Sequence, residues 1–180
     1  MISPKLSIII VAYNMQREIP RTIDSLSSSI QENISDEDYE IIILDNGSSP
    51  PLDIPLANKN NTKIFHIENP SRSPAAAINF GIKQAKGDMV GVFIDGARMA
   101  SPGLLKSVLM AAKLSERPII ATAGFHLGHD IQSVSVTKGY NQDYEDKLLS
   151  EVNWKEDGYR LFDISVFAGS SSNGWFYPLS

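Results

Sequence analysis

The sequence contains no cysteine, no long hydrophobic run and no cluster of basic residues. The absence of cysteine excludes disulfides, thiol nucleophiles and cysteine-bound zinc, and it is compatible with a reducing compartment. The longest apolar runs reach about six residues, whereas a membrane-spanning helix needs about 20. Sixteen Lys and Arg against 21 Asp and Glu give a net charge of −5. That balance argues against a nucleic-acid-binding groove, which normally carries concentrated positive charge.

The N-terminus shows no charged segment followed by an apolar one, so the sequence predicts no secretory signal peptide. We therefore expect a cytoplasmic chain without a transmembrane segment, and peripheral attachment to the inner face of the membrane stays open. A length of 180 residues with 42% hydrophobic and 21% charged residues is ordinary for one soluble domain.

Apolar, β-branched runs alternate along the chain with segments of helical spacing. The runs predict strands at residues 6–12, 39–44, 63–67, 89–94 and 118–123. Apolar residues at three- and four-residue intervals, together with helix start and stop signals, predict helices at residues 16–31, 75–86, 103–115 and 142–154. Strands separated by helices are typical of a layered α/β fold with a mainly parallel sheet.

Three of the predicted strands end in polar residues: Tyr13-Asn14, Asp45-Asn46 and Asp95. Because the carboxyl ends of parallel strands share one edge of a sheet, we expect these residues to lie together. Ligands of open α/β sheets bind at this edge.

Three motifs carry a family resemblance: residues 7–14 (SIIIVAYN), residues 40–48 (EIIILDNGS) and residues 87–95 (GDMVGVFID). In this order and spacing they resemble the family 2 glycosyltransferases of the GT-A fold, over roughly residues 5–115. The resemblance implies a Rossmann-like, three-layer α/β/α fold with a mainly parallel central sheet. It also implies inverting transfer of a sugar from a UDP-, GDP- or dTDP-linked donor to a glycan or another hydroxyl acceptor, as in bacterial-type polysaccharide or glycan biosynthesis.

The resemblance also implies a domain organisation. We expect one GT-A-type domain over residues 1–180, with a nucleotide-binding half at about 5–115 and an acceptor-side part from about 116. The chain stops without a closing element, which predicts a domain truncated at its C-terminus.

The family resemblance assigns the nucleoside to residues at the ends of the first two strands. Ala12 and Tyr13 can supply a flat wall and backbone contacts for a pyrimidine. The family's paired acids hold the base and ribose. Here they read Asp45-Asn46, and the amide oxygen of Asn46 can still accept the imino N–H of the base. Glu18 matches an acid near the nucleoside, and a solvated helix face is its alternative interpretation.

Residues further along the chain are candidates for binding the diphosphate. Arg72 and Arg98 are candidates for neutralising its charge. The family usually has a second acid two residues after Asp95, and both often face a divalent cation. Since Ala97 occupies that second position, a Mg²⁺ or Mn²⁺ site would keep only Asp95 as a side-chain ligand. Metal dependence therefore stays open, and Asp95 can alternatively bind a ribose hydroxyl.

No residue can be assigned as the catalytic base that inversion requires. The downstream acids are Asp130, Asp143, Glu145, Asp146, Glu151, Glu156, Asp157 and Asp163, and no pattern selects one of them. We interpret His66 as a hydrogen-bonded strand histidine. For His126 and His129 we favour a non-functional interpretation over one on the acceptor side.

Two further hypotheses compete with an active transferase. A catalytically silent module that binds nucleotide sugars or acts as a scaffold would also explain Ala97 and the unassigned base. A dinucleotide-dependent oxidoreductase would need a Gly-x-Gly-x-x-Gly turn after the first strand, and residues 13–16 contain no glycine.

Overall fold

The structure is a computed structural model, and it describes residues 3–56 and 61–168. Its strands are β1 (Leu6–Ala12), β2 (Tyr39–Asp45), β3 (Thr62–His66), β4 (Met89–Phe93), β5 (Phe125–Leu127) and β6 (Ser165–Phe167). Its α-helices are α1 (Glu18–Ser25), α2 (Ala75–Gln84), α3 (Leu104–Ala111), α4 (Gln132–Thr137) and α5 (Gln142–Glu151), and 3₁₀ helices span Ala112–Leu114 and Gly158–Ile164. The chain divides into two compact units, Met1–Leu109 and Met110–Ser180, called here the first and second unit.

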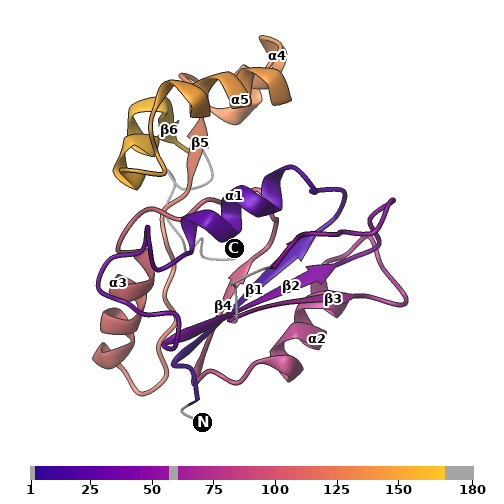
Figure 1. The fold of residues 1–180 in the computed structure, drawn as a ribbon, viewed down its shortest axis with the longest axis vertical. Helices are drawn as coiled ribbons and strands as arrows, with labels where there is room; N and C mark the ends of the chain where they lie inside the picture. Colours follow the sequence, from indigo (N-terminus) through magenta and orange to yellow (C-terminus); the bar gives the residue numbers. More distant parts are fainter. Residues whose placement is uncertain (1–2, 57–60, 169–180) are drawn as a thin grey trace, which may run out of the picture. The chain divides into compact units, whose positions relative to one another are not determined.

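A four-stranded parallel sheet organises the first unit (Figure 1). Its strand order is β3-β2-β1-β4, and every neighbouring pair is parallel. The register pairs Ala12 with Asp45 and Ile10 with Phe93. The ends of β1, β2 and β4 therefore meet at one edge of the sheet, as the sequence predicts.

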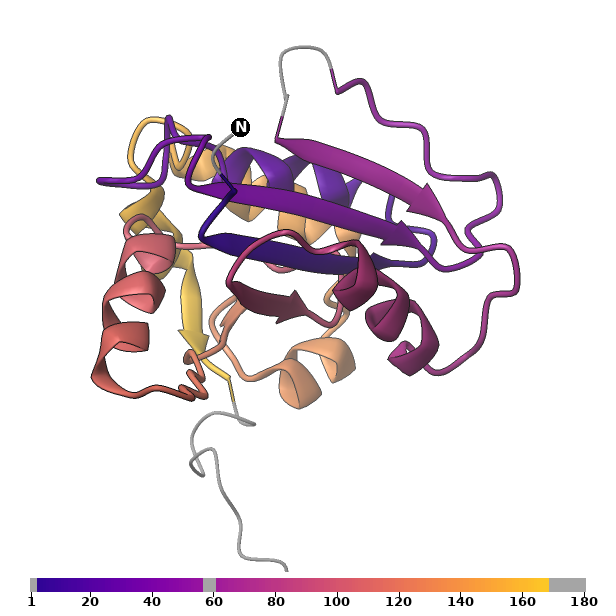
Figure 2. The same cartoon turned by 90° about the horizontal axis from the view of Figure 1, so that it is seen from below.

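Helices cover both faces of this sheet, which gives the expected α/β/α layering. Alternate residues of β1 and β2 point to opposite faces, and all of them are buried. On one face they pack with Ile19 and Ile23 of α1 and with Leu105 of α3. On the other face, Ile9 and its neighbours pack against α2 through Ala77. Figure 2 shows α1 and α2 on opposite sides of the sheet.

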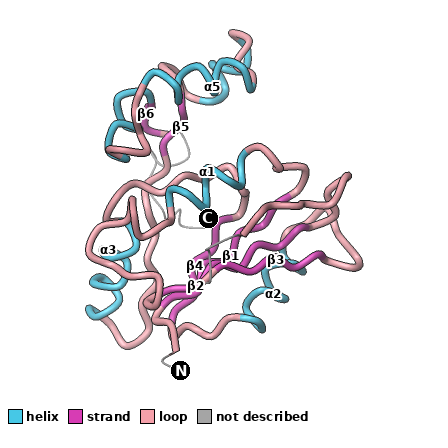
Figure 3. Tube along the Cα trace, viewed as in Figure 1, coloured by secondary structure: helices cyan, strands magenta, loops and turns pink. Residues whose placement is uncertain are grey.

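The predicted strand at residues 118–123 is wrong, because the structure has no regular element there (Figure 3). An apolar, β-branched run forms a strand only when a neighbouring strand completes its hydrogen bonds and buries its side chains. Ile119 is 87% exposed, so neither condition holds. The strand pairing begins only at β5, which the sequence pattern did not indicate.

The helix predicted at residues 16–31 is also too long, since α1 spans only Glu18–Ser25. The side chain of Ser27 donates to the carbonyl of Asp24 and contacts Ser29. Serine side chains that bond to nearby backbone groups offer the chain an alternative to the helix. The helices predicted at residues 103–115 and 142–154 are confirmed in shorter form, as α3 and α5.

The second unit combines a small antiparallel sheet with helices. β5 pairs with β6, and Phe125 lies opposite Phe167. Asn141 caps α5, because its side-chain oxygen accepts from the backbone N–H of Tyr144. The apolar side chains buried here are Leu148, Leu149, Val152, Trp154, Leu161 and Ile164. The sequence pattern predicted neither α4 nor β6. Residues 165–180 are rich in Gly, Ser and aromatic residues without a clear period, and of these residues 169–180 lie outside the described part of the chain.

Within the described residues, none of the helices combines the length and the apolar character that crossing a membrane requires.

Candidate functional site

The carboxyl edge of the parallel sheet brings the predicted nucleoside residues together. The backbone N–H of Asn46 donates to the carbonyl of Ala12 at 2.8 Å, which joins the ends of β1 and β2. Ala12 is buried, whereas Tyr13 next to it is 59% exposed. An exposed aromatic ring beside a buried backbone junction provides a flat surface on a rigid support.

Asn14 and the turn after β2 hold each other through two reciprocal hydrogen bonds. The N–H of Asn14 donates to Ser48 Oγ at 2.9 Å, and the N–H of Ser49 donates to Asn14 Oδ1 at 2.8 Å. Asn14 adopts φ +53°, a left-handed conformation that asparagine tolerates better than most residues. The sequence places Asn14 at this edge but predicts no role for its side chain or for Ser48, although an Asn after one strand and an Asn-Gly-Ser turn after the next are signals of such a turn.

Asp45 lies at this edge, but its carboxylate holds the loop that follows β2. The side chain is 2% exposed. Oδ1 accepts from the N–H of Ser48 at 2.9 Å, and Oδ2 accepts from the N–H of Leu52 at 2.8 Å. His66 at the end of β3 places Nδ1 3.0 Å from Oδ2, and this nitrogen carries the proton because an ionised carboxylate only accepts.

Burial alone would raise the pKa of Asp45. The hydrogen bonds from Leu52, Ser48 and His66 outweigh burial and lower the pKa below its usual value. Asp45 is therefore ionised at neutral pH. The interpretation of His66 as a hydrogen-bonded strand residue is confirmed.

Asn46 connects the edge to the loop that carries Arg72. Its side-chain nitrogen donates to the carbonyl of Ser71 at 2.7 Å. Gly47 adopts φ +94°, and a Cβ there would lie 2.7 Å from the ring of Pro70, so only glycine lets the two loops approach this closely. Arg72 itself is exposed.

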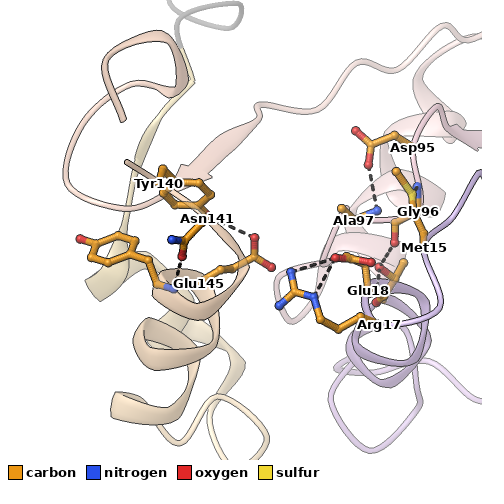
Figure 4. A network of polar contacts seen from close by, with 11 residues as sticks. Met15, Arg17, Glu18, Asp95, Gly96, Ala97, Tyr140, Asn141 and Glu145 are labelled. Carbon is orange, nitrogen blue, oxygen red and sulfur yellow. Dashed lines mark hydrogen bonds and ion pairs between the residues drawn. The ribbon is translucent and has the colours of Figure 1, made fainter. Parts of the chain in front are cut away.

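The loop after β4 carries Asp95 and Arg98. Asp95 Oδ1 accepts from the N–H of Ala97 at 2.8 Å (Figure 4). Asp95 Oδ2 lies 3.4 Å from Arg98 Nε. Gly96 fixes this loop to the first helix region, because its N–H contacts Met15 Sδ at 3.2 Å and its carbonyl accepts from the hydroxyl of Thr22. The side chains of Asp95 and Arg98 are 39% and 58% exposed, so both can reach a ligand.

Glu18 begins α1, and Arg17 binds its carboxylate. The guanidinium nitrogens lie 2.9 and 2.8 Å from Glu18 Oε1 (Figure 4). The carboxylate of Glu18 is therefore part of an ion pair, and its side chain is only 12% exposed.

The donor set at this edge does not fit a divalent cation held by protein side chains. Asp95 offers one carboxylate, and Ala97 offers none. Across the described residues, no group of three or more His, Cys, Asp or Glu side chains is arranged to hold a metal ion.

Several of the downstream acids considered as catalytic bases have structural partners within the second unit. Asp130 pairs with Lys138, Asp163 pairs with Arg160, and the side chain of Asp157 accepts from the N–H of Tyr159. No acid is singled out as a base. His126 packs against the ring of Tyr140, with ring centroids 4.8 Å apart.

These features define a class of protein: an open, parallel α/β sheet with a polar, partly aromatic carboxyl edge suited to a nucleotide ligand. Comparison with protein families makes the assignment specific. The family model for glycosyl transferase family 2 matches residues 7–167, so the chain belongs to this family.

Known proteins with similar sequences are also glycosyltransferases. The chain is 28% identical over 130 residues to validoxylamine A glucosyltransferase of Streptomyces hygroscopicus subsp. limoneus, covering 71% of this chain and 28% of the relative. It is 30% identical over 94 residues to the poly(ribitol-phosphate) β-N-acetylglucosaminyltransferase TarS of Staphylococcus aureus (strain Mu50 / ATCC 700699), covering 51% and 16% of the two chains. The chain thus spans under a third of these relatives.

The solved structure of S. aureus TarS 1–349 has the same fold. The two structures superpose with a TM-score of 0.52 at 25% sequence identity, covering 61% of this chain and 32% of TarS 1–349. This GT-A likeness and the parallel sheet confirm the predicted fold class. TarS 1–349 has also been solved in complex with UDP, and that structure superposes with a TM-score of 0.52 at 22% identity over 65% of this chain and 38% of TarS.

Proposed function

We propose that this family 2 glycosyltransferase chain binds a nucleotide-diphosphate sugar at the carboxyl edge of its parallel sheet. One observation carries the proposal: Tyr13, Asn46 and Asp95 come from three separate strands and arrive at one edge, two of them joined by hydrogen-bonded loops. The UDP complex of TarS, which shares the fold, favours a uridine donor.

Each residue has a role that follows from its surroundings. The exposed ring of Tyr13 stacks on the base, with Ala12 as the buried support beneath it. The oxygen of Asn46 is an acceptor for the base imino group, because its nitrogen is already committed to Ser71. Asp45 positions the loop between them, and the Arg17–Glu18 pair borders the nucleoside.

The charged loops receive the diphosphate and ribose. Arg72 and Arg98 neutralise phosphate charge, and Asp95 accepts from a ribose hydroxyl. Asp95 supplies only one carboxylate, whereas a divalent cation needs several oxygen ligands. We therefore expect donor binding to depend weakly or not at all on Mg²⁺ or Mn²⁺.

We further propose that the protein transfers the sugar with inversion to a hydroxyl of a glycan or another acceptor. We also propose that it works in the cytoplasm, with peripheral contact to the inner membrane face as one arrangement. The base that removes the acceptor proton is not assigned to any residue.

Calorimetric titration of the chain with UDP, GDP and dTDP, with and without Mn²⁺, tests donor binding. We expect saturable binding of at least one nucleotide, weakened by Tyr13→Ala. If none of the three binds under either condition, the proposal is wrong.

A catalytically silent binding module is the second candidate, and Ala97 in place of the usual acid favours it. An active transferase turns over its donor, whereas a silent module only binds it. Hydrolysis or transfer of sugar from a bound donor by a longer form of the protein would exclude the silent module.

A further inference from the structure

The second unit contains a cavity that the nucleotide site does not use. It measures about 200 Å³ and is lined by His129, Asp130, Ser135, Lys138, Tyr140 and Tyr144, among others. Typical pockets for drug-sized ligands start at about 300 Å³, so this cavity has room for one small ring and not for a nucleotide.

Aromatic rings form one wall of this cavity. Tyr140 and Tyr144 meet edge to face, with centroids 5.6 Å apart, and the imidazole of His126 packs against Tyr140 at 4.8 Å. Burial lowers the pKa of His126, against the opposing effect of Glu145, so the imidazole is neutral and packs as an aromatic neighbour. The hydroxyl of Tyr140 donates to Glu145 at 3.1 Å, which fixes the ring in place (Figure 4).

A negatively charged and a positively charged side chain also line this cavity. Asp130 and Lys138 form an ion pair at 2.8 Å, and their side chains remain 40% and 65% exposed. The carboxylate accepts hydrogen bonds and the ammonium donates them, so the pair matches two neighbouring hydroxyl groups. Because the two charges cancel, the cavity has little preference for an anion such as phosphate.

A buried nitrogen near the cavity lacks a partner. His126 Nε2 has no hydrogen bond to any of the residues that the structure describes. A Cβ on Gly128 would lie 3.9 Å from this nitrogen, 3.7 Å from Ser135 Oγ and 3.6 Å from Tyr140 Cε2. His126 Nε2 therefore lies close to two residues of the cavity lining, Ser135 and Tyr140. A buried polar atom is normally satisfied by protein, water or ligand.

We propose that this cavity binds one pyranose ring of a saccharide. A pyranose has an apolar C–H face that stacks on tyrosine rings, and its rim of hydroxyls pairs with Asp130 and Lys138. The proposal rests on the proposed function in one respect, namely that the saccharide is the sugar acceptor of the transferase. Binding of the ring itself does not depend on it.

Saturation-transfer NMR on the full chain tests the proposal, with methyl β-D-glucopyranoside and N-acetylglucosamine as probes. Sorbitol is the matched control, because it carries the hydroxyls without a ring face. We expect saturable transfer to at least one pyranose and none to sorbitol. Equal transfer to all three probes, or to none of them, would overturn the proposal.

Substitutions of cavity residues test whether the pyranose binds in this cavity. Tyr144→Ala is expected to weaken pyranose binding about tenfold, since it removes a stacking ring, while Tyr144→Phe keeps the ring and retains binding. Asp130→Asn is expected to weaken binding as well. Tyr159→Ala and Asp163→Asn alter an exposed tyrosine and an exposed acid outside the cavity lining and serve as matched controls. If the controls weaken binding as much as the cavity variants do, the cavity is not the site.

A parallel UDP titration separates the two proposals. Pyranose binding without nucleotide binding would leave the cavity assignment standing and reject the nucleotide site. Nucleotide binding without pyranose binding would support the nucleotide site and reject the cavity assignment.

Discussion

At the scale of single residues, Asp45 organises the carboxyl edge of the parallel sheet without facing solvent. Its two oxygens hold Ser48 and Leu52 from the loop and His66 from the neighbouring strand. The sequence shows that an acid ends β2, and that much was predicted. It does not show where the oxygens point, because their partners lie up to 21 positions away and meet Asp45 only after β2 and β3 have paired.

Substitution of His66 tests this arrangement. Asn places an amide donor near the position of Nδ1 and is expected to retain the bond to Asp45, whereas Ala removes it. We expect His66→Ala to lower the free energy of unfolding by about 1 kcal/mol, which is below the range usual for hydrogen bonds to a charge because the imidazole is half exposed. Urea unfolding and the amide NMR shifts of Ser48 and Leu52 measure the effect. Identical behaviour of the Asn and Ala variants would show that the bond is unimportant.

Ala97 is the residue at which the family pattern breaks. Ala97→Asp places a second carboxylate two residues after Asp95, and two hard oxygen ligands suit a divalent cation. We expect nucleotide binding to become stronger in Mn²⁺ for this variant and to change little for the uncharged control Ala97→Asn. Calorimetry in Mn²⁺ and in EDTA makes the comparison. If nucleotide binding to Ala97→Asp is equally strong in Mn²⁺ and in EDTA, the side chain at this position does not face the diphosphate.

At the scale of elements, the turn between α2 and β4 fixes how β4 joins the sheet. The N–H of Lys86 donates to Glu40 at 2.7 Å, and the N–H of Gly87 donates to Ser7 Oγ at 2.8 Å. A Cβ on Gly87 would lie 2.6 Å from the backbone nitrogen of Ser7, and backbone cannot move aside cheaply. Gly87 is therefore a requirement of the β1–β4 junction.

Gly87→Ala is expected to lower the free energy of unfolding by about 1–3 kcal/mol, the usual range for overpacking. Gly91→Ala in β4 is the matched control, since its Cβ would meet only Leu6 Cδ1 at 3.9 Å. Chemical denaturation of both variants tests the prediction. Equal stability of the two would contradict the close packing at Gly87.

Elements were predictable where the local pattern and the burial agree. β1 and β2 are apolar, β-branched runs buried on both faces, so the signal in the sequence was strong. The run at 118–123 carries the same signal, yet Ile119 is exposed and has no strand to pair with. Pairing depends on distant parts of the chain, which is why a local pattern alone gave the wrong result there. The end of α1 depended on the side-chain bonds of Ser27, whose geometry the sequence does not display.

At the scale of the whole molecule, several carboxylates have lowered pKa values in the folded state. The hydrogen bond from Lys5, with help from Ser35, lowers the pKa of Asp38 to about 2. Burial opposes the shift at Glu40 and Asp45, but their hydrogen bonds lower both pKa values. A lowered folded-state pKa contributes stability above the unfolded-state value and loses it as the pH falls.

We therefore expect the free energy of unfolding to decrease from about pH 4.5 down to about pH 2. The difference between wild type and Asp38→Asn is expected to be constant above pH 5 and to shrink toward pH 2, as Asp38 becomes protonated in both states. Urea unfolding at a series of pH values checks both. A difference that grows on acidification would contradict the assigned ion pair.

We infer that a nucleotide binds at the carboxyl edge of the parallel sheet. Amide NMR shifts during a UDP titration test it most directly, because they report where the ligand lies. We expect the shifted amides to cluster at Tyr13–Asn14, at Asn46–Ser48 and at Asp95–Arg98. Shifts confined to the opposite edge, around Lys5 and Gly87, or to the second unit would contradict it.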